Sequence, residues 1–138
     1  MKKTIIKITN LAFATFLLIS FNGCTKYEEG PNFSFRSKNE RLSNIWKVEN
    51  YKINDKDFTS LVASYTETFS KQNAYNYSWG VLNGEGSWVF QNDDKEVKLT
   101  GNDNQSQRVL TILKLEEKTL WYTYTLDGDK HELHLISK

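Results

Sequence analysis

Cysteine and proline are nearly absent from this chain, which has one of each in 138 residues. A single cysteine excludes an internal disulfide, so a packed hydrophobic core has to supply the stability of the folded part. The formal net charge is only +1, and acidic and basic residues alternate along the chain. A nucleic-acid-binding protein is expected to gather positive charge on one face, so we expect no nucleic-acid partner.

The short motifs that most often mark catalysis or cofactor binding are also missing, since there is no Gly-x-Ser-x-Gly sequence and no phosphate-binding loop. The two histidines, His131 and His134, stand three apart in a predicted strand, so they would face opposite sides and could not bind one metal together. Asn102-Asp103-Asn104 and Asp127-Gly128-Asp129 lack the spacing of a calcium-binding loop, and we interpret both as turns. We therefore expect no enzyme activity, no cofactor and no metal site.

The longest apolar run, Leu11 to Phe21, ends shortly before the only cysteine, Cys24. Three lysines precede the run, and a small residue, Gly23, stands directly before the cysteine. This order is typical of a lipoprotein export signal, which is cleaved and followed by acylation of the cysteine. The run has eleven residues, whereas a transmembrane helix needs about 20. We predict a signal peptide over 1–23 and a lipid anchor on Cys24 that holds the protein at the cell outer membrane.

Three alternatives to lipidation are a plain secretory signal, a transmembrane anchor and a buried structural cysteine. The plain signal is favoured by Phe21 and Asn22, which stand where lipoprotein signals usually carry leucine and a small residue. Acylation, by contrast, would consume a thiol that is reactive in an oxidising compartment.

Residues 24–37 contain the only proline and show no apolar periodicity, so we interpret them as the lipidated cysteine and a tether. Lys26 followed by Glu28-Glu29 resembles the lysine-plus-acidic signals that direct lipoproteins of Bacteroidota-type bacteria to the cell surface. Removal of 1–23 would remove three lysines and no acid, which changes the formal net charge from +1 to about −2.

From residue 65 onward, short apolar segments recur between turn-forming residues, which is typical of an all-β domain. With an earlier segment they make eight predicted strands: 45–53, 65–70, 75–79, 86–90, 96–100, 108–115, 120–126 and 130–137. Three connections are short enough to require antiparallel neighbours: Asn92-Asp93-Asp94, Glu116-Glu117-Lys118 and Asp127-Gly128-Asp129. The sequence predicts one antiparallel all-β domain over 38–138.

Local patterns predict two short helical segments. Ser37 and Glu40 fit a capping box, which predicts a helical turn over 38–43. Residues 57–64 have apolar side chains at helical spacing over little more than two turns. We interpret this second segment as a short lid-like helix.

The first strand contains a change of parity. Trp46 and Val48 would face one side, and Tyr51 and Ile53 the other. A β-bulge near residues 49–50 would return all four side chains to the same face.

The segments 108–115 and 120–126 are apolar on both faces. In the first of them, Leu110 and Ile112 share one face, and Val109, Leu113 and Leu115 share the other. We expect the second face to be covered, by default by the helix at 57–64; a symmetry mate and a partner protein are the alternatives.

Eight strands in order, preceded by a helical turn and with a tryptophan early in the first strand, resemble the lipocalin-like (calycin) barrels. The lipocalin signature is Gly-x-Trp; here Asn44-Ile45-Trp46 stands in its place, and Gly86-Ser87-Trp88 repeats the spacing. These motifs, with Ile112-Leu113-Lys114-Leu115 and Leu120-Trp121, look like the small lipocalin-like lipoproteins of Bacteroidota-type bacteria. The resemblance implies an eight-stranded antiparallel up-and-down barrel.

An eight-stranded barrel either fills its interior with side chains or leaves one small cavity. Tyr122 and Tyr124 are the candidate cavity residues, because they share a parity and their hydroxyls could orient a ligand. The alternative is that they belong to a filled aromatic core. We expect a membrane-anchored envelope lipoprotein that binds a small apolar or amphipathic ligand, or else a non-enzymatic accessory subunit of an outer-membrane or cell-surface assembly with a protein partner.

Overall fold

The computed structural model describes residue 27, residues 34–101 and residues 107–138. The predicted signal peptide over 1–23, the anchor at Cys24, most of the tether over 24–37 and the turn Asn102-Asp103-Asn104 lie outside these residues. In the part that is described, no helix is both long and apolar enough to cross a membrane.

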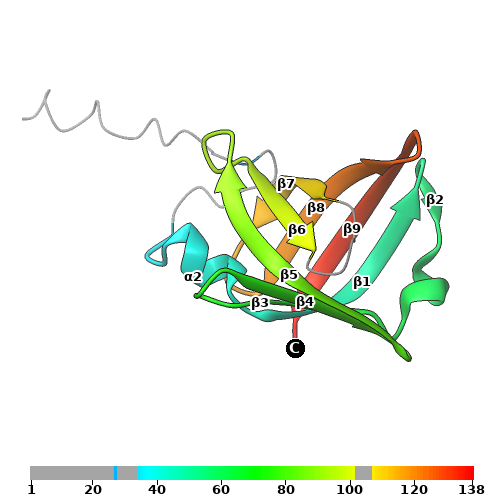
Figure 1. The fold of residues 1–138 in the computed structure, drawn as a ribbon. Helices are drawn as coiled ribbons and strands as arrows, with labels where there is room; N and C mark the ends of the chain where they lie inside the picture. Colours follow the sequence, from blue (N-terminus) through cyan, green and yellow to red (C-terminus); the bar gives the residue numbers. More distant parts are fainter. Residues whose placement is uncertain (1–26, 28–33, 102–106) are drawn as a thin grey trace, which may run out of the picture.

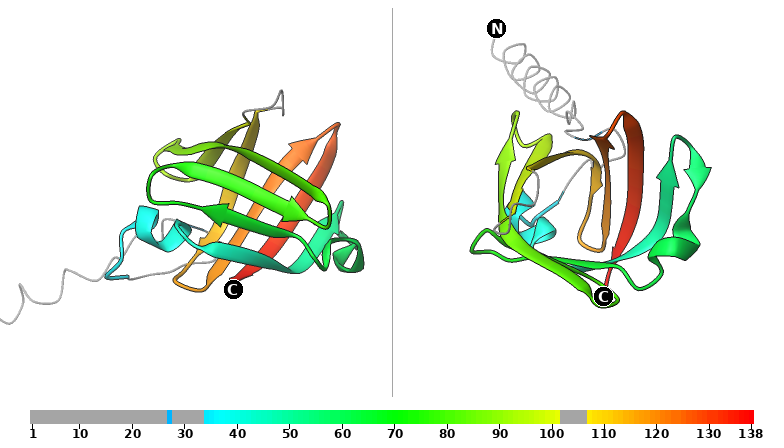
Figure 2. Two further views of the ribbon diagram at one scale, coloured as in Figure 1. Left: turned by 60° about the horizontal axis from the view of Figure 1, so that its bottom comes forward. Right: turned by 45° about the vertical axis from the view of Figure 1, so that its right-hand side comes forward.

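The described residues form a closed antiparallel barrel of eight strands in up-and-down order, which confirms the predicted fold (Figures 1 and 2). A two-residue strand, β2, folds back on β1 and adds a ninth to the sheet. The elements are α2 (Lys38–Leu42), β1 (Ile45–Ile53), β2 (Lys56–Asp57), the 3-10 turn η1 (Thr59–Val62), β3 (Thr66–Phe69), β4 (Ala74–Trp79), β5 (Leu82–Gln91), β6 (Glu96–Gly101), β7 (Arg108–Leu115), β8 (Thr119–Leu126) and β9 (Asp129–Ser137).

Strand β1 closes the barrel by pairing with β9 along most of its length, from Trp46 to Ile53. On its other edge it pairs with β3 only over Ile45 to Lys47. The register with β9 shifts between Val48 and Asn50, so the predicted bulge is present. The second half of β1 therefore leaves β3, and its free edge is bound by the segment that contains β2 and η1: Phe58 donates its amide to the Tyr51 carbonyl at 2.8 Å.

Helix α2 lies at one end of the barrel, and β2 with η1 lies at the opposite end (Figure 1). Ser37 caps the helix with the predicted capping box, in which its hydroxyl accepts from the Glu40 amide and the Glu40 carboxylate accepts from the Ser37 amide. Leu42 packs into the barrel, and its carbonyl accepts a hydrogen bond from Trp46 Nε1 at 2.9 Å. Tyr27, from the segment predicted to be tether, is also buried there.

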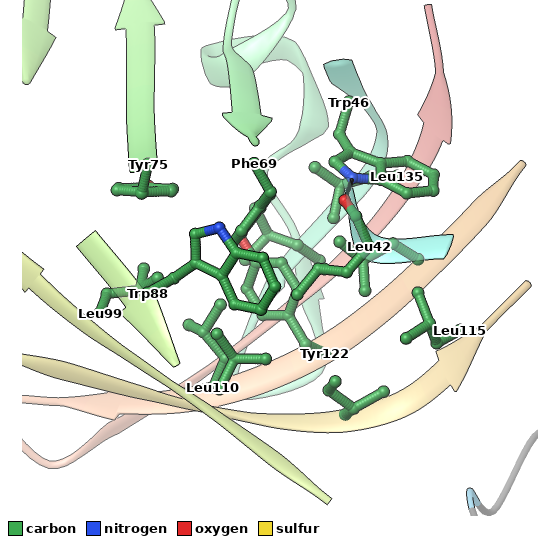
Figure 3. Close-up of a cluster of buried hydrophobic side chains, with 14 of the residues drawn as sticks. Leu42, Trp46, Phe69, Tyr75, Trp88, Leu99, Leu110, Leu115, Tyr122 and Leu135 are labelled. Atoms are coloured by element: carbon green, nitrogen blue, oxygen red, sulfur yellow. Dashed lines mark hydrogen bonds between the residues drawn. The ribbon is translucent and has the colours of Figure 1, made fainter. Parts of the chain in front are cut away.

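Large side chains fill the half of the interior next to α2 (Figure 3). Trp46 and Trp88 are fully buried, and the Trp88 ring meets Phe69 edge-on with 6.0 Å between centroids. The second Gly-x-Trp motif supports this packing, because a Cβ on Gly86 would collide with the Thr100 carbonyl on the neighbouring strand. Both motifs thus place a tryptophan in the core.

Tight turns join the strands where polar residues predicted them. In Asp127-Gly128 both residues have positive φ, 52° and 90°, and residues 92–94 have φ between 51° and 58°. Asn54 and Asp55 form a further turn of this kind, after which the chain folds back on β1 as strand β2, which was not predicted. Asn and Asp tolerate this left-handed backbone better than other non-glycine residues.

The prediction for the second face of β7 was wrong for Leu115. The register between β7 and β8 shifts between Ile112 and Lys114, and this bulge turns Leu115 into the core, where it is fully buried. The default cover was wrong as well: residues 57–64 form a strand end and a 3-10 turn that packs against β1. On the outer face of β8, Trp121 is partly covered by the chain itself, since its ring stacks on that of His134 with 4.0 Å between centroids and Lys114 lies over it.

Trp46→Ala is expected to lower the free energy of unfolding by about 3–5 kcal/mol, because it leaves a large cavity beside α2 and frees the Leu42 carbonyl. Urea unfolding followed by far-UV circular dichroism measures this loss. Val89→Ala is the control, because Val89 is 47% exposed on the outer face and should change stability by less than about 0.5 kcal/mol. Equal effects of the two substitutions would contradict the assignment of Trp46 to the core.

Candidate functional site

The half of the barrel away from α2 contains a cavity of about 580 Å³, a volume typical of small-molecule sites. Side chains from the second half of β1, from η1 and from the adjacent ends of β4 to β9 form its wall. The lining residues are Tyr51, Ile53, Leu61, Val62, Tyr65, Tyr75, Tyr77, Trp79, Leu82, Glu85, Leu99, Gly101, Arg108, Tyr122, Tyr124 and Leu133. Apolar and aromatic residues predominate, and Glu85 and Arg108 are the charged residues of this set.

Beneath the cavity lies a buried carboxylate, Glu67 of β3, whose side chain is 1% exposed. Its Oε1 atom accepts hydrogen bonds from the hydroxyls of Tyr65 at 2.6 Å and of Tyr75 and Tyr122 at 3.0 Å. Tyr122 also lies 3.0 Å from Oε2. We call these three tyrosines the tyrosine floor, because they line the cavity on one side and hold the carboxylate on the other.

Burial governs the ionisation of this cluster. Loss of hydration raises the pKa of Glu67, and the hydrogen bonds from Tyr65, Tyr122 and Tyr75 and the charge of Arg108 offset only part of that rise. Burial, followed by the nearby Glu67 carboxylate, raises the pKa of the Tyr122 and Tyr75 hydroxyls. The tyrosines therefore remain hydrogen-bond donors at every physiological pH.

A second polar group joins β1, β8 and β9, and its tyrosines, Tyr51 and Tyr124, line the cavity. Tyr51 Oη and His131 Nδ1 lie 2.7 Å apart, and the His131 ring stacks on Tyr124 with 4.6 Å between centroids. Burial lowers the pKa of His131, which keeps the imidazole neutral near pH 7. Burial also favours the neutral form of Tyr124, and it raises the pKa of that hydroxyl to about 12.

Arg108, the first residue of β7, brings a positive charge to the same cavity. Its guanidinium carbon lies 4.5 Å from the centre of the Tyr124 ring, a cation–π contact. The side chain is half-buried, and an arginine stays charged in such surroundings.

The predicted site residues Tyr122 and Tyr124 both line the cavity. They differ in their contacts. The Tyr122 hydroxyl donates a hydrogen bond to Glu67, whereas the Tyr124 ring contacts the Arg108 guanidinium and stacks on the His131 ring. Their role in ligand binding stays a prediction. His131 is buried inside the barrel and His134 lies outside against Glu132, which agrees with opposite faces. Across the described ranges, no three His, Cys, Asp or Glu side chains come close enough to hold a metal.

Glu67 and Arg108 were not among the predicted site residues, although strand parity indicates both. Glu67 shares the inward parity of Phe69 in β3, and Arg108 shares that of Leu110 and Ile112 in β7. A charged residue at an inward position of an alternating strand points to a buried polar site, because such a position otherwise carries an apolar side chain.

Apolar side chains also surround the mouth of the cavity, at η1 and the turn between β4 and β5. Leu61 is 61% exposed and Val81 95% exposed. Trp79 ties the two segments together, since its Nε1 donates to the Leu61 carbonyl at 3.1 Å.

Comparison with known proteins identifies the fold and no activity. No protein-family model matches the chain, and no curated protein matches it in sequence. Among solved structures, it is similar to a DUF4847 family protein from Bacteroides vulgatus ATCC 8482, with a TM-score of 0.51 and 11% identity over 70% of this chain and 94% of that one. At this identity the likeness shows the fold alone, a barrel of a kind that occurs in Bacteroides.

Glu67→Gln tests the ionisation of the buried carboxyl. Folding raises the pKa of Glu67, so its contribution to stability is complete below about pH 4.3, the ordinary glutamate pKa, and is lost as the pH rises through the folded-state value. The free energy of unfolding of the wild type, relative to the variant, should therefore fall with rising pH. A tenfold difference between the two ionisation constants corresponds to about 1.4 kcal/mol.

Urea unfolding between about pH 4 and pH 8 measures this difference. Glu85→Gln is the control, because it makes the same substitution at an exposed position of the neighbouring wall. A wild-type protein that gains stability over Glu67→Gln as the pH rises would show that the tyrosine hydrogen bonds outweigh burial.

Proposed function

We propose that this protein is a non-enzymatic binding module, a lipocalin-like barrel that takes up a small apolar or amphipathic ligand. The observation that carries the proposal is the division of the interior. One half is filled by large side chains, and the other half encloses about 580 Å³ with a predominantly apolar wall. A few polar groups at fixed positions in an apolar cavity are typical of small-molecule sites.

A purely structural barrel offers a poorer account of this cavity. Unfilled volume lowers stability, because the lining side chains lose dispersion contacts. The chain nevertheless carries Arg108 and Tyr51 on the wall, with His131 bonded to Tyr51, although leucine or phenylalanine at these positions would fill space and need no polar partner. A site that accommodates a ligand explains both the volume and the polar groups.

Ligand binding should raise the thermal stability of the full chain in phosphatidylcholine nanodiscs. A ligand at a hundredfold its dissociation constant adds about 2.7 kcal/mol to the free energy of unfolding. We expect such a rise from members of a panel of fatty acids and sterols, but not from small glycans. Melting curves recorded by intrinsic tryptophan fluorescence measure it.

Ile53→Trp is designed to fill the cavity and should abolish the stabilisation. Val89→Trp adds the same ring to the outer face, where Val89 is 47% exposed, and should preserve it. No stabilisation by any fatty acid or sterol, together with a ligand-free mass of the full chain in native mass spectrometry, would contradict the binding function.

We further propose that the barrel is a lipoprotein of the cell outer membrane, anchored through acyl chains on Cys24. The support is the order of lysines, apolar run, Gly23 and Cys24 in the sequence. A single acyl chain binds a membrane reversibly, whereas two or more hold a protein stably, since each buried methylene contributes about 0.8 kcal/mol.

Cys24→Ser should leave the protein unprocessed or released from the membrane fraction, because the thioether to the lipid can no longer form. Cell fractionation and the mass of the mature N-terminus measure this outcome. Thr25→Ser is the matched control and should be processed and retained like the wild type. Unchanged processing and fractionation of Cys24→Ser would rule out the anchor.

A second candidate function is that of an accessory subunit in an outer-membrane or cell-surface assembly. The exposed apolar side chains at the mouth, above all Val81 and Leu61, favour this reading, because such patches mark interaction surfaces. A ligand-free full chain that co-purifies with an envelope protein, and loses it on Val81→Lys but not on Val89→Lys, would favour the subunit over the carrier.

A further inference from the structure

The positive charge in the cavity has no anionic partner in the described part of the chain. Arg108 lies against the face of the Tyr124 ring, and no carboxylate of the described residues is within salt-bridge distance of it. An aromatic face satisfies a guanidinium only in part, since the five N–H donors lie in the guanidinium plane. N–H donors of Arg108 can therefore bind a ligand in the cavity that this residue lines.

Glu67 and Glu85, which lie beneath the cavity and at its mouth, do not take that role. Glu67 lies behind the tyrosine floor, where three hydroxyls occupy its oxygens. It acts on Arg108 only as a charge at a distance. Glu85 lines the mouth from β5 and is exposed to solvent.

The rest of the wall near Arg108 is suited to an apolar chain. Leu99 and Leu133 are 4% exposed and line the cavity from β6 and β9, and Ile53 and Leu61 line it from β1 and η1. A ligand with one charged end and an apolar body would match this distribution, with the charge beside β7 and the body between β1, β6 and β9.

We infer that the cavity binds an amphiphile with a single negatively charged headgroup, such as a carboxylate, and that Arg108 on the Tyr124 ring is the headgroup site. The inference rests on the proposed function and names the class of its ligand. One negative charge is preferred over two, because the Glu67 carboxyl lies below the same cavity and a second ligand charge would have no cation to meet. A cationic amphiphile is disfavoured, because it would have to share the cavity with Arg108.

The experiment compares three probes with the same ten-carbon tail: decanoate, 1-decanol and decyltrimethylammonium. Each is titrated into the full chain in phosphatidylcholine nanodiscs at about pH 8, where the carboxylate is ionised. We expect decanoate to bind at least about tenfold more tightly than decanol, because a hydrogen bond between charged groups is worth at least that factor. Tryptophan fluorescence and the shift in melting temperature measure binding.

Arg108→Met should reduce the preference for decanoate over decanol to within about twofold, while decanol binding persists. Arg108→Lys keeps the charge and should retain part of the preference, which protects the test if the methionine variant is unstable. Lys98→Met is the control: it removes a positive charge from the outer face of β6, beside β7, and should behave like the wild type. Partition of each probe into empty nanodiscs is measured separately and corrects its free concentration, so that the affinities of decanoate and decanol can be compared within one variant as well as between variants.

Equal binding of decanoate and decanol by the wild type, or tighter binding of decyltrimethylammonium, would overturn the anionic headgroup and leave the binding function intact. A preference for decanoate that survives in Arg108→Met would place the headgroup elsewhere and overturn the assignment of Arg108. Binding of none of the three probes, by contrast, would contradict the proposed function itself.

Discussion

The interior of this barrel depends on one buried carboxylate. Glu67 accepts hydrogen bonds from Tyr65, Tyr75 and Tyr122, and so links β3 and β4 to β8 through the middle of the barrel. A buried carboxyl is stable only when its oxygens have partners, which fixes the positions of the three rings. The same rings are the boundary between the two halves of the interior, because Tyr75 and Tyr122 belong both to the packed core and to the cavity wall. The polar cluster thus positions the site as well as the fold.

Much of the fold could be predicted from local patterns. The strands at 45–53 and 108–115 have the predicted bounds, and the capping box of Ser37 and the bulge near Glu49 are both present. These features follow from residues that are close in sequence: apolar alternation, a serine three residues before a glutamate, and a change of parity within one strand. Up-and-down order likewise follows from short connections, since each strand pairs with its neighbour in the chain.

What could not be predicted depends on contacts between distant segments. The bulge that turns Leu115 inward arises in the pairing of β7 with β8. The polar residue of β7 does change parity, from Thr111 to Lys114, but apolar Val109 and Leu113 mask this change. The cavity wall was predicted only through Tyr122 and Tyr124, because its other members come from nearly every strand and from η1. For Glu67 the parity of β3 shows a charged residue facing inward, but the distance in sequence to Tyr122, 55 residues, hides the partner that makes this tolerable. Strand parity thus indicates that Glu67 is buried, but only the closed barrel shows the tyrosine hydroxyls that bind its carboxylate.

The cavity in one half of the barrel follows from the pairing of β1 with two different strands, β3 and β9. The first residues of β1 pair on both edges, with β3 and β9, and there the core is filled around Trp46. After the bulge β1 stays with β9 and leaves β3, so a wider space has to be enclosed by a short segment of β2 and η1. Besides the short pairing of β2 with β1, that segment is held by the hydrogen bonds of Phe58 and Thr59 with Tyr51, of Thr59 with Asn50 and of Trp79 with Leu61. Regions held in this way open at lower free energy than a packed core. The strand that closes the barrel at one end therefore also creates the volume at the other, and the segment of β2 and η1 covers that volume.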